Sequence, residues 1–235
     1  SGLGKFAFGT ENYQLVHTVT GWIAWVLMFQ SGTHFRFAVV RERWQEACIG
    51  VWVFLIGATL STLLVRSFIA MFPVVSPTEH FWVFSVLVGI PMGMGAVVVI
   101  NSTYQEKRVI TTPWAITNIA SLGLNEFAGL LAFSIAINLA LQSGNGGALQ
   151  SILTCVAIAL ATVFALCGRK LAASAVDALA QRNKNEQAAL IGVLTGLALL
   201  CGLAAERIGI NGMLGAFLFG VLISEAEGLR ERTKK

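Results

Sequence analysis

Residues 117–129 read Thr-Asn-Ile-Ala-Ser-Leu-Gly-Leu-Asn-Glu-Phe-Ala-Gly, within an apolar segment that runs from about Trp114 to Leu141. As a helix, such a segment is long enough to cross the roughly 30 Å hydrocarbon layer of a bilayer. Glu126 lies near its middle, whereas the other acidic residues lie in polar stretches or near the ends of apolar segments. Because a charged side chain at that depth costs roughly 2.5 to 3.5 kcal/mol on insertion scales, Glu126 is a candidate functional residue.

The composition of the chain is typical of an integral membrane protein. Hydrophobic residues make up 56% of the sequence and charged residues 12%, which is about half the charge of a soluble domain. Apolar segments predict an all-α, polytopic transmembrane helix bundle of about seven spans in the lipid bilayer. We expect a single transmembrane domain, 1–235, with a cytoplasmic linker or short helix at 168–186. The predicted spans lie near 13–30, 47–72, 80–100, 111–141, 147–167, 187–204 and 210–224.

The basic residues support this map independently of hydropathy. All but Lys5, Arg66 and Arg207 of the 16 lysines and arginines fall in alternate loops or in the C-terminal tail. By the positive-inside rule we expect a plasma-membrane protein whose N-terminus is outside and whose C-terminus is cytoplasmic. The same distribution argues against a nucleic-acid partner, because a binding face would gather the charge on one surface. The chain begins at Ser1, and we expect it to be a fragment of a longer protein.

Polar residues accompany Glu126 on its predicted helix. Thr117, Ser121 and Asn125 follow one another at a spacing of four and therefore share a face, which Glu126 flanks. Oxygen donors of this kind suit a hard cation, so the four residues form a candidate cation site. The alternative is that the hydroxyls bond neighbouring helices and that Glu126 is protonated and silent.

The third predicted span contains a helix-breaking sequence. Gly89, Pro91 and Gly93 lie close together near its middle. Proline removes a backbone donor and glycine lowers helix propensity, so this span is expected to be interrupted. Non-helical backbone at membrane depth often forms transporter binding sites. The alternative is a kink that serves helix packing.

Enzyme signatures are absent from the sequence. It contains no HExxH, GxSxG or GxxxxGK[ST] motif, and no two acidic residues are paired within the spans. Its four cysteines include no CxxC pair and are interpreted as packing residues. We therefore expect neither an enzyme nor a resident cofactor.

Several motifs resemble those of the cation:proton antiporters, a family with the sodium/proton-exchanger fold. Residues 209–220, Gly-Ile-Asn-Gly-Met-Leu-Gly-Ala-Phe-Leu-Phe-Gly, are similar to the family's LGAF-x-x-G signature. Phe29-Gln30-Ser31-Gly32 resembles the Phe-x-x-Gly ending of an early span. Asn125-Glu126 resembles the Asn-Asp or Asp-Asp pair of the ion site, with glutamate in place of aspartate, and Pro91 would match the proline of an unwound crossing helix.

The resemblance implies a secondary transporter that exchanges Na⁺ or K⁺ for protons by alternating access. Glu126 would carry the proton or the cation in turn, Asn125 would orient it, and the interrupted span would supply backbone carbonyls. A homodimer would be compatible with this reading. The family has further spans, so the chain would be part of a longer transporter.

Two alternatives stay open at this stage. A second register would set the ion-site pair at Asn138-Leu139, without a carboxylate. In that case, or if Glu126 is structural, the chain would be a non-transporting or degenerate membrane subunit.

Overall fold

The computed structural model describes residues 10–35, 37–71, 81–141, 147–182, 187–224 and 226. Within these ranges the chain forms α-helices joined by short connections and no strand, which confirms the all-α prediction. The helices are α2 (Thr10–His34), α3 (Phe37–Glu42), α4 (Trp44–Met71), α5 (Phe81–Gly93), α6 (Val97–Glu106), α7 (Pro113–Leu141), α8 (Gly147–Arg182), α9 (Gln187–Arg207) and α10 (Gly212–Ile223).

Five stretches of the described chain are long and apolar enough to cross a membrane: Trp44–Met71, Trp82–Glu106, Pro113–Ala140, Thr154–Ala178 and Ala189–Arg207. The first predicted span corresponds to α2, which does not reach that threshold, and the last corresponds to α10, a shorter apolar helix. The helices thus follow the order of the predicted spans in a transmembrane bundle.

Helix α8 differs from the predicted boundaries. It continues without a break to Arg182, so residues 168–182 of the predicted linker are helical. Hydropathy marks where a helix leaves the lipid, whereas backbone hydrogen bonding continues past that point. The predicted boundary positions 72 and 80 and the basic residues Lys5, Arg36, Lys184, Arg230, Arg232, Lys234 and Lys235 lie outside the described residues.

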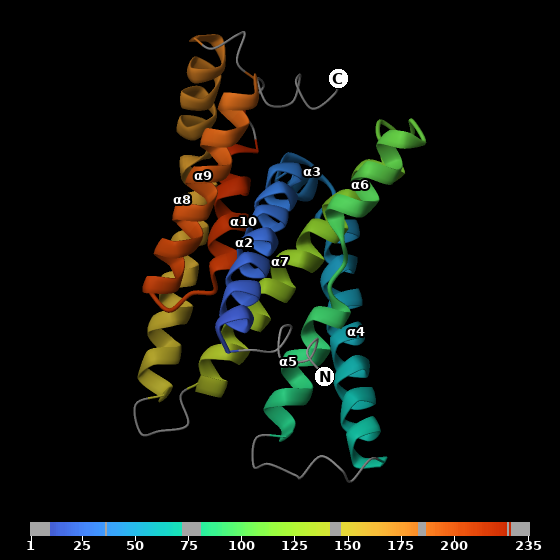
Figure 1. Cartoon of the computed structure of the whole chain (residues 1–235). Coiled ribbons are helices and arrows are strands. Elements are labelled where there is room, and N and C mark those ends of the chain that lie inside the picture. The colour runs from blue at the N-terminus through green and yellow to red at the C-terminus, as the bar shows by residue number, and fades with distance from the viewer. Residues whose placement is uncertain are drawn as a thin grey trace.

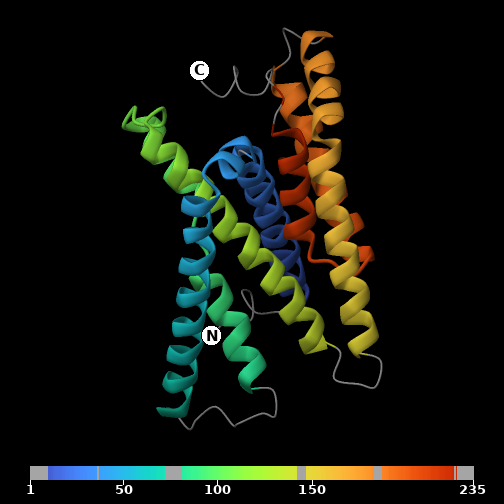
Figure 2. The same cartoon turned by 180° about the vertical axis from the view of Figure 1, so that it is seen from behind.

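The helices pack most extensively within two groups. Helices α4, α5 and α7 form one group, here called the α4 group, and α2, α9 and α10 form the other, here called the α10 group. Figures 1 and 2 show α8, α9 and α10 on one side of the bundle and α4 and α5 on the other, with α2 and α7 between them. Glu126 of α7 lies where α7 meets α2.

Small residues bring the backbones together inside each group. A Cβ atom at Gly50 of α4 would lie 1.9 Å from the carbonyl oxygen of Ser121 in α7. In the α10 group, a Cβ atom at Gly220 would lie 2.3 Å from the carbonyl oxygen of Phe29 in α2. Helices in lipid associate through such close packing, so each group is held together at the level of its backbones.

The connections alternate between the two ends of the bundle. The α2–α4 corner and the α6–α7 connection lie at one end, and the α9–α10 turn lies toward the other (Figure 1). The first two carry Arg41, Arg43, Lys107 and Arg108, whereas Arg207 precedes the α9–α10 turn. The described basic loops therefore share one end, as the sequence pattern predicts.

Candidate functional site

The third predicted span is interrupted at residues 94–96. Helix α5 ends at Gly93 and α6 begins at Val97, so Met94, Gly95 and Ala96 are non-helical. Pro91 lies inside α5, in its last turn, and the carbonyl oxygen of Pro91 accepts a hydrogen bond of 3.2 Å from the amide of Met94. The prediction of an interrupted helix is confirmed, and the break follows the proline.

Gly89 and Gly93 serve the packing of α5 against α4. A Cβ atom at Gly89 would lie 2.1 Å from the Thr62 hydroxyl, and one at Gly93 would lie 2.5 Å from the Ala58 amide nitrogen. These two glycines are one helical turn apart and present the same edge to α4. The close approach fixes the end of α5 and hence the position of the break.

Asn125 joins the end of α5 and the break itself to α7. Its Oδ1 accepts a hydrogen bond of 2.6 Å from the backbone amide of Gly95, and its Nδ2 donates one of 3.4 Å to the carbonyl oxygen of Gly93. Only 2% of the Asn125 residue surface is exposed. The carboxamide thus supplies partners for backbone groups that lost their helical ones, as a break at membrane depth requires.

Glu126, the next residue, is buried at the contact between α7 and α2. It is 3% exposed and is the buried charged residue among the side chains that the structure describes. The hydroxyl of Ser31 in α2 donates a hydrogen bond to Glu126 Oε2, and the carboxylate also interacts with the backbone amide of Val97. Val97 begins α6, and the amide dipoles at a helix N-terminus favour negative charge.

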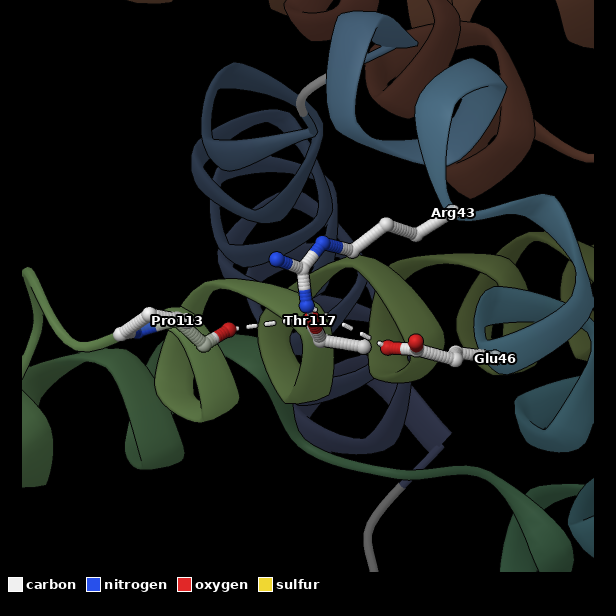
Figure 3. Close-up of polar contacts among 4 residues, drawn as sticks. All are labelled: Arg43, Glu46, Pro113 and Thr117. Carbon is white, nitrogen blue, oxygen red and sulfur yellow. Dashed lines mark hydrogen bonds and ion pairs between the residues drawn. The ribbon is translucent and has the colours of Figure 1, made fainter.

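The remaining members of the predicted cation site lie elsewhere on α7. Thr117 accepts a hydrogen bond of 3.2 Å from Arg43 Nη1, and its own hydroxyl donates to the carbonyl oxygen of Pro113 at 3.0 Å. Figure 3 shows the side chain of Arg43 reaching Thr117 on α7, with Glu46 nearby. Arg43 Nη1 lies 3.6 Å from Glu46 Oε2. Thr117 is nine residues from Glu126, which is about 13 Å along a helix.

Thr117 and Ser121 line an open recess of about 520 Å³, together with Arg43, Glu46, Ile49, Pro113, Trp114 and Asn118. Ser121, one of the lining residues, also packs closely against the backbone of Gly50 in α4. The structure therefore brings Asn125 and Glu126 to the break but does not bring Thr117 and Ser121 to Glu126.

Asn138, the residue of the second register, contacts a different part of the fold. Its Nδ2 donates hydrogen bonds of 2.9 Å to the carbonyl oxygen of Ser134 and 3.0 Å to that of Gly209. Gly209 lies in the α9–α10 turn with a φ of 86°, a left-handed conformation that suits glycine. The asparagine at the helix break is thus Asn125, as in the first register.

Ser31 is the site residue that the sequence did not single out. It belongs to the Phe29–Gly32 motif, which drew attention to that stretch but not to its hydroxyl. The described residues contain no cluster of three or more His, Cys, Asp or Glu side chains that could hold a metal ion. The oxygen atoms at the break that could bind a cation are those of one carboxylate and of backbone carbonyls, and such oxygens suit a weakly held hard cation.

A buried carboxylate beside an interrupted transmembrane helix is the arrangement found in membrane transporters that bind ions at mid-depth. The sequence matches the transmembrane family of sodium/hydrogen exchangers over residues 1–235, and the chain belongs to this family. None of the curated proteins searched matches the chain significantly.

Proposed function

We propose that the protein exchanges a monovalent cation, Na⁺ or K⁺, for protons and that Glu126 binds the two in turn. Membership of the sodium/hydrogen exchanger family supports cation/proton transport in general. The single observation that supports a role for Glu126 is the attachment of its neighbour, Asn125, to Gly93 at the end of α5 and to Gly95 within the break. This attachment keeps the buried carboxylate of Glu126 beside the non-helical backbone of residues 94–96.

Competition for one carboxylate couples the two fluxes. The carboxylate accepts either a proton or a cation, and both neutralise it. For the cation, carbonyl oxygens at the end of α5 offer further oxygen ligands. For the ionised carboxylate, the amides at the start of α6 supply stabilising dipoles. Asn125 orients the segment and does not itself exchange protons.

The direction of the chain in the membrane follows from the positive-inside rule. The end that carries Arg41, Arg43, Lys107 and Arg108 would face the cytoplasm. The α9–α10 turn would then lie toward the outside, and the N-terminus of the chain would be extracytoplasmic.

The test is cation-driven proton movement by the full-length protein in proteoliposomes. An inward sodium or potassium gradient is imposed and proton release is followed with a trapped pH-sensitive dye. Wild type should exchange, and Glu126→Gln should not, because the amide keeps the shape of the side chain but binds neither a proton nor a cation as a carboxylate does. Glu206→Gln makes the same change in an exposed residue of α9 and should exchange like wild type.

Unchanged exchange in Glu126→Gln, with the variant folded by size-exclusion chromatography, would assign Glu126 a structural role. Absence of exchange in wild type with either cation would instead favour the non-transporting alternative.

A further inference from the structure

Ser31 lies where the two helix groups meet, beside the candidate carrier residue Glu126. It is 1% exposed, and its hydroxyl donates to Glu126 Oε2 across the contact between α2 and α7. Since α2 belongs to the α10 group and α7 to the α4 group, this hydrogen bond joins the two groups through the carboxylate.

Ser31 is held firmly within the α10 group. A Cβ atom at Gly32, the next residue, would lie 2.2 Å from the carbonyl oxygen of Phe217 in α10. The backbones of α2 and α10 therefore touch directly beside Ser31. A movement of α7 relative to α10 would leave Ser31 with α10.

Glu126 is held equally firmly within the α4 group. Its neighbour Asn125 is bonded to Gly95, and Ser121 lies against the backbone of Gly50 in α4. The same movement would thus carry Glu126 away from Ser31.

Other contacts lie at the boundary between the α4 group and the α10 group, and their strength does not depend on the charge of Glu126. Phe217 of α10 stacks on Phe127 of α7 with ring centroids 6.0 Å apart and meets Phe35 edge-on at 6.3 Å. A second hydrogen bond between the groups, from Asn138 to the carbonyl oxygen of Gly209, joins two neutral partners. Among these contacts between the described parts of the two groups, Ser31–Glu126 is the one whose strength depends on the ionisation of the carboxylate.

We infer that Ser31 is a positioning residue that holds the ionised, unloaded Glu126 against the α10 group and thereby restrains movement of the empty carrier. This inference rests on the proposed function. A hydrogen bond to an ionised acceptor is roughly twice as strong as one between neutral groups. A proton or a cation on Glu126 neutralises the carboxylate, weakens the bond and releases α7. An exchanger stays coupled only if its loaded forms move and its empty form does not.

The test measures coupling rather than rate. Full-length protein in proteoliposomes, with the membrane potential clamped, is given a sodium gradient, or a potassium gradient if wild type moves potassium. Cation uptake is followed by radiotracer and proton release by a trapped dye in the same vesicles. In Ser31→Ala, cation uptake without proton release should rise about tenfold relative to coupled exchange, which corresponds to about 1.4 kcal/mol lost from the restraint.

Two variants act as controls. Ser31→Thr restores the hydroxyl and should restore the wild-type ratio of protons to cations. Ser134→Ala removes another buried serine hydroxyl, which lies in α7 and has no hydrogen-bond partner among the described residues, and should keep the wild-type ratio. If Ser31→Ala is not recovered folded, Ser31→Cys carries the test, because its thiol is a weaker donor and should give an intermediate ratio.

The inference is overturned if folded Ser31→Ala keeps the wild-type ratio or if it loses coupled and uncoupled flux together. Either result leaves the proposed function intact, provided that wild type exchanges and Glu126→Gln does not. Failure of wild type to exchange either cation would overturn both.

Discussion

Removal of the Asn125 side chain should destabilise the helix break specifically. Asn125→Ala deprives the amide of Gly95 of a 2.6 Å hydrogen bond and the carbonyl oxygen of Gly93 of a weak one of 3.4 Å. An unsatisfied buried donor costs about 1 to 3 kcal/mol, and the lower part of this range applies because the bond is only partly buried. We therefore expect a loss of about 1 to 2 kcal/mol, to which the long bond adds little.

The assay is thermal unfolding of the purified protein in detergent. For a chain of this size, about 1 to 2 kcal/mol corresponds to a fall in Tm of roughly 2 to 8 °C. Asn118→Ala is the matched control, since Asn118 also lies in α7 and donates a single bond of 2.6 Å to the Tyr104 hydroxyl near the helix end. Tyr104 is only half-buried, so its hydroxyl can find another partner.

The reasoning predicts a clearly larger fall in Tm for Asn125→Ala than for Asn118→Ala. Equal falls would refute the view that Asn125 supports the break, because the two changes remove the same side chain from the same helix.

Two further predictions test the packing and the extent of the site. Gly50→Ala should lower stability by about 1 to 3 kcal/mol, because its methyl group would meet the Ser121 backbone at 1.9 Å, whereas Gly192→Ala, with no atom within 4 Å, should be neutral or stabilising; comparison of their Tm values decides the point. Thr117→Val should retain coupled exchange with an unchanged apparent affinity for the cation, because Thr117 bonds Arg43 about 13 Å from Glu126. A large loss of cation affinity in Thr117→Val would restore Thr117 to the cation site.

Local sequence was sufficient to predict the helices and the break. Apolar length identified the spans, because backbone groups in lipid must be satisfied within a helix. Pro91 identified the interruption because it removes a donor, and the observed break begins three residues later, at Met94. Pro113 begins α7, a position where its missing amide costs nothing.

Neighbours in space could not be read from periodicity. The spacing of Thr117, Ser121 and Asn125 correctly gives one face of α7, but that face meets different partners along its length. Near one end it meets Arg43 from the α3–α4 corner, and at its middle it meets the break. A shared helix face was therefore insufficient to define a shared site.

Ser31 is a second example of a contact that the sequence could not predict. Its hydroxyl lies beside Glu126 in the tertiary structure, in a part of α2 where Gly32 and Gly220 let α2 and α10 approach closely. The Phe29–Gly32 motif marks this stretch, but nothing in the local sequence singles out the Ser31 hydroxyl over those of Ser85 and Ser134, which are equally buried in the bundle. Its role depends on tertiary packing across 95 residues of chain.

The contact with Ser31 gives a physical reason for glutamate rather than aspartate at position 126. On a helix, successive side chains point about 100° apart, so Asn125 and the residue that follows it contact different partners. Glu126 reaches Ser31 on α2 as well as the amide of Val97, and the methylene that distinguishes it from aspartate extends the carboxylate by about 1.5 Å, one carbon–carbon bond. An aspartate would withdraw the carboxylate from the hydroxyl by a similar distance. The glutamate and Ser31 therefore form one unit, in which the longer acid makes the contact with the α10 group and the serine makes that contact sensitive to charge.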